Sequence, residues 1–501
     1  MTGPPLTLVA GVAVLVAVVA GGQRLGEPPA SPRPVVQAVP VTGVVAVCPD
    51  VKQVKGVLAT RVSVGAAPRA DGADLPTEKG QVVSQPLSAN GAPSVVPIDG
   101  PGSVVPGLGD TVQGDALVVT ASGPVAAGLE VEQVSSGEVG PARGLAGLRC
   151  EAPRTESWFV GGATTVGRDS TVVLANPDDT PAIVDISVLT RDGAVDQRPG
   201  RGITVPPRGR TSYKLDQIAP DKTALAVHVE AERGRVASAL SYTSVDGRTE
   251  AGADWVPQAL PPATRVVVPG LPAVNGGQRF VQVSNWGADD TTVSVRLTTS
   301  EASFLPDGMD AIVVKAMSST TVDVGKAMGT EPATVEITSD GSPVVAGGLA
   351  VDSQPGSPVT DVSFAGSALP LSGPAVLTDL VIDRPTESDL ILSALQSDAV
   401  VEVRPIPVKG VPGPLPAAIR VPVAGGRSYV LRLSTFLPPG ATGRLAVEVR
   451  AVAGSGQVYA SRYLRTRGAR GPLTTMLVLQ GAAQEVPRPP VGRDPLVGAG
   501  G

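Results

Sequence analysis

The chain's single histidine, His228, is the residue to which acid–base chemistry near neutral pH would most readily fall. It lies within residues 225–230, where apolar and polar side chains alternate as in a half-buried β-strand, and the alternation places it on the polar face. No Gly-x-Ser-x-Gly turn and no cysteine in a catalytic context accompanies it. We therefore expect His228 at the surface, no catalytic residue, and a protein that is not an enzyme.

Two pairs of adjacent carboxylates, Asp178 with Asp179 and Asp289 with Asp290, are the other candidates for chemistry. Glycosidases use two carboxylates about 5–10 Å apart, but adjacent residues in a strand or turn usually point away from each other. Each pair also closely follows an asparagine, and the two asparagines lie 109 residues apart, which is typical of repeated turn chemistry. Calcium binding at these turns is the alternative. We expect no metal site and no cofactor.

The three tryptophans, Trp158, Trp255 and Trp286, are candidates for stacking on sugar rings. The competing interpretation is that each lies at the boundary between two units and covers the end of a core. We retain all three as candidate glycan contacts.

Cys48 and Cys150 are the only cysteines, and they bracket the first unit of the chain. A disulfide between them would close a loop of 102 residues and stabilise the fold by about 4–5 kcal/mol in the chain-entropy model. Such a bond lasts in an oxidising compartment. Two free thiols are the alternative, and a metal site would need more ligands than two cysteines and a distant histidine supply.

Elements that could position these residues recur along the chain. A short polar turn followed by a strand of small apolar residues occurs four times, and the first valines of these strands are separated by 111, 108 and 114 residues: Val125, Val236, Val344 and Val458. This period predicts a tandem array of domain-sized units. Between the markers the chain alternates apolar and polar residues and is interrupted by many of its 50 prolines and 60 glycines, which favours short antiparallel strands.

We therefore predict an all-β fold, a tandem array of about four immunoglobulin-like β-sandwiches after an N-terminal signal or anchor segment. Sandwiches that exchange a strand are the alternative, because the apolar residues 158–161 could pair with either neighbour. The predicted parts are a signal peptide or anchor at 1–22, a Pro-rich linker at 23–40, sandwiches at 41–151, 152–261, 262–371 and 372–482, and a disordered tail at 483–501.

Composition limits the partners. Apolar residues make up 42% of the chain and charged residues 17%, which is compatible with folded cores, although only 5 Phe, 5 Tyr and 3 Trp are present to fill them. The net charge of −6 and the absence of a basic stripe argue against binding to nucleic acid.

The first residues indicate the compartment. Residues 6–20 form a nearly unbroken apolar run, which is shorter than the roughly 20 residues that span a bilayer comfortably and is typical of a signal-peptide core. No lysine or arginine precedes the run, whereas Arg24 follows it, which counts against ordinary cleavage. We expect an extracytoplasmic protein, either secreted or held at the cytoplasmic membrane by this segment if it is not cleaved.

Two motifs carry a resemblance to a known family: the Leu-x-Asn-Pro turn at residues 174–177 and the Val-Pro-Pro-x-Gly-Arg segment at 205–210. With the secretory segment and the Val/Ala/Gly-rich units, the chain resembles the actinobacterial secreted or membrane-anchored proteins of domain-of-unknown-function family 5719, from about Cys48 to Gln480. The resemblance implies no activity and no site residues. Members of that family tend to be encoded beside a glycosyltransferase and mannose-metabolism genes, which implies a role in the cell envelope.

Two functions follow as expectations. The first is a non-catalytic exported envelope protein, a scaffold or interaction rod of repeated sandwiches whose partner is an envelope protein or a glycan. The alternative is a carbohydrate-binding or glycan-processing accessory protein of the envelope.

Overall fold

The computed structural model describes residues 37–51, 58–68, 80–88, 92–108, 116–274, 278–381, 386–408, 415–436, 444–482 and 484–488. The predicted signal or anchor segment at 1–22 lies outside these residues, as do nearly all of the predicted linker and most of the predicted tail. No helix in the described part of the chain is long and apolar enough to cross a membrane.

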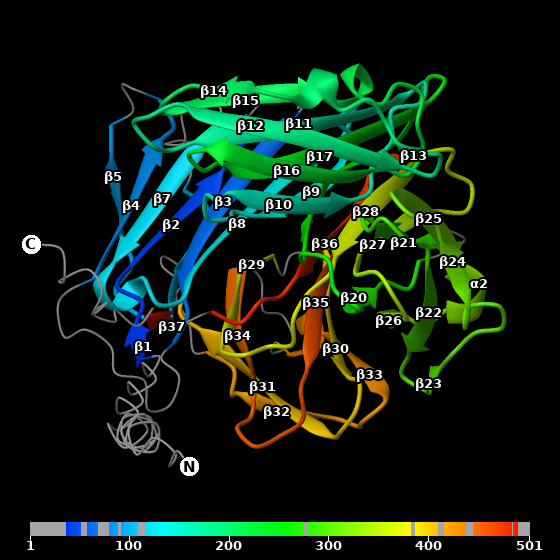
Figure 1. Ribbon diagram of the computed structural model, residues 1–501. Helices are drawn as coiled ribbons and strands as arrows, with labels where there is room; N and C mark the ends of the chain where they lie inside the picture. The colour runs from blue at the N-terminus through cyan, green and yellow to red at the C-terminus, as the bar shows by residue number, and fades with distance from the viewer. Residues whose placement is uncertain are drawn as a thin grey trace, which may run out of the picture. The chain divides into compact units, whose positions relative to one another are not determined.

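The described residues form antiparallel β-sheets, as the alternation predicts, and the all-β fold class is confirmed (Figure 1). Residues 40–484 form one compact unit. Strands β1 (Gln37–Pro40) and β37 (Glu485–Arg488) pair as a two-stranded sheet at the two ends of the described chain.

Within residues 40–484, eight sheets form four sandwiches, each with its own apolar core. In each sandwich we call the sheet that contains the first strand the leading sheet and the other sheet the trailing sheet.

Sandwich 1 has the leading sheet β2 (Gly43–Cys48), β7 (Leu117–Ser122), β4 (Gln81–Pro86) and β5 (Ser94–Val96), and the trailing sheet β6 (Ser103–Val105), β3 (Leu58–Ala66), β8 (Leu129–Gly137) and β9 (Gly144–Arg149). A 3-10 turn, η2 (Gly123–Val125), precedes β8.

Sandwich 2 has the leading sheet β13 (Gly193–Ala194), β12 (Ala182–Thr190), β16 (Ala226–Arg233), β10 (Glu156–Val160) and β19 (Gln258–Ala259), with β14 (Ile203–Val205) also beside β12. Its trailing sheet is β15 (Gly209–Lys214), β11 (Arg168–Asn176), β17 (Ala237–Asp246) and β18 (Thr249–Val256), and it includes the 3-10 turns η3 (Arg198–Gly200) and η4 (Leu215–Gln217).

Sandwich 3 has the leading sheet β20 (Arg265–Leu271), β26 (Ala333–Ser339), β22 (Thr291–Thr298) and β23 (Ser303–Phe304), with β24 (Ile312–Val314) also beside β22. Its trailing sheet is β25 (Ser318–Asp323), β21 (Arg279–Asn285), β27 (Val344–Ser353) and β28 (Thr360–Gly366), and one helical turn, α2 (Gly325–Met328), follows β25.

Sandwich 4 has the leading sheet β29 (Ala375–Val381), β34 (Arg444–Ala451), β31 (Ala399–Ile406) and β32 (Ile419–Val423). Its trailing sheet is β33 (Arg427–Arg432), β30 (Glu387–Ala394), β35 (Tyr459–Gly468) and β36 (Gly471–Val478), with the 3-10 turn η5 (Leu433–Phe436) after β33.

Strand β22 shows why the alternation produces these sheets. Val293, Val295 and Leu297 are buried in the core of sandwich 3, whereas the intervening Ser294 and Arg296 lie on the opposite face. Successive side chains of a strand point to opposite faces, so the sequence pattern alone fixes which face meets the core. It does not say what covers the other face.

The other face is often covered by a neighbouring sandwich. In each case the leading sheet of one sandwich packs on the trailing sheet of the next: β10 on β27, β20 on β30 and β35, and, at the 1–2 boundary, Val47 of β2 against Ala175 and Ala237. The leading strand β29 of sandwich 4 in turn packs on β3 and β8 of sandwich 1. The four sandwiches therefore contact one another in a closed cycle, which differs from the expected linear rod.

The strand at residues 158–161 does not join two sandwiches. Among the described residues β10 pairs with β16 and β19, both in sandwich 2, so the alternative of exchanged strands is not observed. The sandwich strands cover 43–149, 156–259, 265–366 and 375–478. The predicted domain ranges remain a prediction, because residues 40–484 form a single compact unit.

Candidate functional site

His228 lies in an aromatic cluster rather than at the open surface, so that expectation was wrong. Its ring stacks on Trp158, the residue opposite it across the β10–β16 pair, with ring centroids 3.8 Å apart and planes 13° apart. Trp286 contacts both rings edge-on, at 5.0 Å from Trp158 and 5.7 Å from His228. The His228 side chain is only 15% exposed, because sandwich 3 covers the polar face of its strand.

The polar atoms of this cluster are only partly satisfied. Nε2 of His228 lies 2.9 Å from Oε1 of Glu156. Burial lowers the pKa of His228, and the bond to Glu156 acts in the opposite direction. The indole nitrogens of Trp158 and Trp286 are buried and have no hydrogen-bond partner among the described residues. The cluster thus combines aromatic rings with two donors that are free to bind an acceptor.

Trp255 lies elsewhere. It packs with Leu148, Val173 and Ala239 in the contact between sandwiches 1 and 2. The structure therefore brings together two of the three predicted glycan contacts and His228, whose link to them the sequence did not reveal. Register across β10 and β16 was the signal that could have indicated it.

The two repeated asparagines organise turns. Nδ2 of Asn176 donates to the carbonyl oxygens of Thr180 (2.7 Å) and Val205 (3.3 Å), and its Oδ1 accepts from the backbone N–H of Asp178 (3.0 Å). Asn285 makes the same three bonds with Asp289 (2.8 Å), Val314 (3.2 Å) and Gly287 (2.8 Å). These buried amides explain why the asparagine recurs.

The carboxylate pairs are used in the same turns. Asp178 accepts two hydrogen bonds of 3.0 Å from Arg235, Asp179 pairs with Arg208, and Asp290 pairs with Lys315 at 2.7 Å. All are at least partly exposed. In the part of the chain that the structure describes, no three His, Cys, Asp or Glu side chains gather as a metal site.

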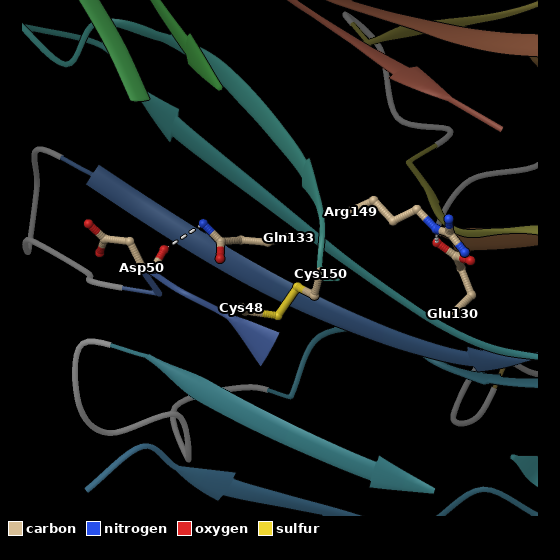
Figure 2. Close-up of a disulfide and its surroundings, with 6 residues drawn as sticks. All are labelled: Cys48, Asp50, Glu130, Gln133, Arg149 and Cys150. Atoms are coloured by element: carbon tan, nitrogen blue, oxygen red, sulfur yellow. Dashed lines mark hydrogen bonds and ion pairs between the residues drawn. A yellow bond between two sulfur atoms is a disulfide. The ribbon is translucent and has the colours of Figure 1, made fainter. Parts of the chain in front are cut away.

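The predicted disulfide is present between Cys48 and Cys150 (Figure 2). It joins the end of β2 to the residue after β9 and so ties the first strand of sandwich 1 to its last. Nearby, Nε2 of Gln133 donates to the carbonyl oxygen of Asp50 at 2.5 Å. Glu130 and Arg149 form a 2.6 Å ion pair, and burial raises the pKa of Glu130 to about 7 although Arg149 opposes that shift.

Sequence reasoning missed a second use of carboxylates, which we call the central junction: Asp254 on β18 and Asp361 on β28. Asp254 accepts hydrogen bonds from the backbone N–H groups of Trp255 (2.8 Å), Phe364 (3.1 Å) and Gly147 (3.1 Å) and from Oγ1 of Thr475 (2.9 Å). These four donors come from sandwiches 2, 3, 1 and 4.

Asp361 repeats the arrangement. It accepts from the backbone N–H groups of Val362 (3.0 Å), Ala253 (3.2 Å), Leu145 (3.2 Å) and Thr474 (2.7 Å), again one from each sandwich. Strands β9, β18, β28 and β36 are thus bonded through two buried side chains.

Burial and hydrogen bonding shift the pKa values of the two junction aspartates in opposite directions. Burial raises the pKa of Asp254 well above its ordinary value and that of Asp361 to about 8, while the N–H donors lower both. The buried guanidinium of Arg143 compensates part of the charge and donates to the carbonyl oxygens of Thr360 (3.0 Å) and Pro472 (3.1 Å). The junction holds the sandwiches together and presents no reactive group to solvent.

A cavity of about 600 Å³ lies beside the aromatic cluster, between sandwiches 2 and 3. Strand β10 connects the two features, because Trp158 belongs to the cluster and Val160 lines the cavity.

The fold and these sites define an all-β protein of four sandwiches joined through a buried polar junction. The model of the family described as a family of unknown function, DUF5719, matches residues 109–413, and the chain belongs to that family. No curated protein matches the sequence. A crystal structure of Thermotoga maritima 1070 is similar over 21% of this chain and 95% of its own, with 13% identity and a TM-score of 0.18, which is too low to carry an argument.

Proposed function

We propose that this protein is a non-catalytic, exported component of the cell envelope that acts as a compact scaffold for another envelope protein or a glycan. The observation that carries the proposal is the central junction. Its buried carboxylates and Arg143 bond to backbone groups of the four sandwiches, so the most strongly perturbed charged groups are committed to structure. Of the exposed carboxylate pairs, Asp178, Asp179 and Asp290 form ion pairs with basic side chains.

Export is supported by the disulfide, which is durable in an oxidising compartment. Fractionation of the native host, with alkylation before and after reduction, tests this part. We expect the protein outside the cytoplasm with both cysteines protected until reduction. Cytoplasmic protein with freely alkylated thiols would overturn it.

The scaffold role is tested by complementing the envelope phenotype of a deletion strain. We expect rescue by His228→Ala and by Asp289→Ala combined with Asp290→Ala, because none of these side chains belongs to the central junction. We expect no rescue by a chain that lacks residues 372–482. Failure of either point variant, when it is folded and exported at the wild-type level, would favour catalysis or metal binding instead.

A second candidate, carbohydrate binding, is favoured by the aromatic cluster. Its indole donors have no partner, and Trp286 remains partly exposed. A glycan array with the purified exported protein tests it. Binding that is lost in Trp286→Ala and kept in Trp255→Phe would support a sugar site at the cluster, since Trp255 lies in a different contact. No binding on the array favours the scaffold alone.

A further inference from the structure

The cavity between sandwiches 2 and 3 is lined in part by the backbone of four glycines. Gly161 and Gly162, which follow β10, face Gly347 and Gly348 of β27 across it, and Phe364 of β28 adds an aromatic wall. A Cβ on Gly161 would meet the ring of Phe364, and Gly162 has a φ of +90°, so larger residues are disfavoured at both positions. Its volume is within the range of small-molecule sites.

The internal repeat shows that this boundary differs from two others in the type of one residue. Val173, Gln282 and Ile391 occupy equivalent positions, each three residues before the end of strands β11, β21 and β30 and 109 residues apart. Val173 packs against Trp255 in the boundary between sandwiches 1 and 2, and Ile391 packs against sandwich 3. Only the middle position carries a polar side chain, and that residue lines the cavity of about 600 Å³.

Gln282 is buried, and the hydrogen-bonding capacity of its side-chain amide is not fully used. Its side chain lines the cavity and the residue is 7% exposed, yet Nε2 makes no hydrogen bond to any residue that the structure describes. A buried amide without a hydrogen-bond partner destabilises the fold, whereas an apolar residue at this position, as in the other two sandwiches, leaves no polar group unpaired. A ligand oxygen in the cavity would satisfy this donor.

The polar and charged side chains that line the cavity indicate which class of ligand it can bind. The lining residues with polar side chains are Gln282, Thr320 and Thr321 of sandwich 3 and Thr223, Tyr242 and Arg191 of sandwich 2. The Arg191 side chain is exposed and forms no salt bridge with the described residues. Among the described residues that line the cavity there is no Asp or Glu. The remaining walls, including Phe280, Leu349 and Phe364, are apolar.

We propose that this cavity binds an apolar carboxylate, such as a medium-chain acyl acid. The carboxylate lies at the open side against Arg191 and within reach of the amide of Gln282, and the hydrocarbon packs on the apolar walls and the glycine backbone. Burial of the chain supplies affinity, and the two donors select an anion over a cation or a neutral alcohol. This inference does not depend on the scaffold proposal.

Isothermal titration of the full exported protein with decanoate, below its micellar concentration, tests the proposal. Decyltrimethylammonium and decanol are the charge controls. We expect saturable binding of decanoate with one site, and binding of both controls at least tenfold weaker. Wild-type protein that binds no decanoate at millimolar concentration, or binds the cation equally well, would refute it.

Variants locate the site. Arg191→Gln should weaken decanoate binding roughly tenfold, because it removes a charge-assisted bond. Gln282→Ile copies the residue of sandwich 4, so it should unfold at the same or a higher temperature than the wild type and also lose at least tenfold in affinity. Arg248→Gln, an exposed arginine of sandwich 2 that does not line the cavity, should bind as the wild type does. Unchanged affinity in both Arg191→Gln and Gln282→Ile would show that decanoate binds elsewhere.

Discussion

The aspartates of this protein have two roles that their residue type does not distinguish. Asp178, Asp179 and Asp290 are at least partly exposed and pair with cations in turns. Asp254 and Asp361 are buried, and each accepts one donor from every sandwich. Removing an exposed aspartate leaves groups that water can satisfy, whereas removing a buried one leaves four donors without a partner.

The pH dependence of stability should report on Asp361. Burial raises its pKa from 3.8 to about 8, so the folded state binds a proton more tightly than the unfolded state does. The free energy of unfolding contributed by this group is therefore greatest below about pH 4 and is lost as the pH rises towards 8. Urea unfolding at pH 5, 7 and 8.5 measures it.

Asp361→Asn should be less stable at each of these pH values, because its amide N–H₂ faces backbone donors, and its decline between pH 5 and 8.5 should be shallower than that of the wild type. Asp290→Asn, at an exposed turn, should keep the wild-type slope. A wild type that gains stability over this range, with the gain removed in Asp361→Asn, would show that the carboxylate is already ionised at pH 5.

The disulfide is the second feature whose contribution to stability can be assigned to individual residues. Replacing both Cys48 and Cys150 by serine should lower the free energy of unfolding by about 4–5 kcal/mol in the chain-entropy model, since the bond closes a loop of 102 residues. Chemical denaturation of oxidised wild type, reduced wild type and the double variant measures this. Equal stability of the oxidised and reduced wild type would contradict the prediction.

At the scale of elements, the recurring asparagine turn joins the two sheets of a sandwich. Asn285 lies at the end of β21 in the trailing sheet and bonds to Val314 at the end of β24 beside the leading sheet. The amide thereby fixes how the chain passes from one sheet to the other. This role explains why an asparagine recurs at the same position of the repeat.

Asn285→Ala should therefore destabilise the protein by about 2–4 kcal/mol, because it removes three hydrogen bonds at a buried site. Asp289→Ala in the same turn is the matched control and should stay within about 0.5 kcal/mol of the wild type, since its side chain is exposed. The difference between the two variants in thermal or urea unfolding tests the assignment. Equal losses of stability in the two variants would mean that any substitution in the turn is destabilising and that the buried amide has no special role.

At the scale of the whole molecule, the cycle of contacts within residues 40–484 makes the sandwiches interdependent. Sandwich 4 supplies Thr474 and Thr475 to the central junction, and Thr378 donates to the buried carboxylate of Glu132 in sandwich 1 at 2.6 Å. A linear array would leave sandwiches 1 and 4 with one neighbour each, whereas here they also contact each other.

A chain that ends at residue 371 should consequently unfold well below the intact protein or aggregate, because it loses contacts at both boundaries of sandwich 4. The intact protein should unfold in one calorimetric transition, with calorimetric and van't Hoff enthalpies that agree. Four separate transitions, or a truncated chain that melts at the temperature of the intact one, would show that the sandwiches are independent.

Much of this architecture could be predicted from the sequence because its signals are local. Alternation of apolar and polar residues gave the strands and their buried faces, and the spacing of Asn176 and Asn285 gave the period. The candidate sites were harder. Gln282 reads as an ordinary polar position of an alternating strand, and only its comparison with Val173 and Ile391 indicates an exception.

The sequence by itself determined the all-β class, the repeat and the partner of each cysteine, since these depend on residues close together or on a choice among two thiols. Tertiary structure alone decided that His228 stacks on Trp158, that Asp254 and Asp361 join four strands, and that a cavity opens at Gln282. Alternation identifies the polar face of a strand, but it cannot say whether water or another sandwich covers that face. The donors at the junction, such as Gly147, Ala253, Phe364 and Thr475, are also separated by roughly one period each, so only packing of the complete cycle brings them to the same carboxylates.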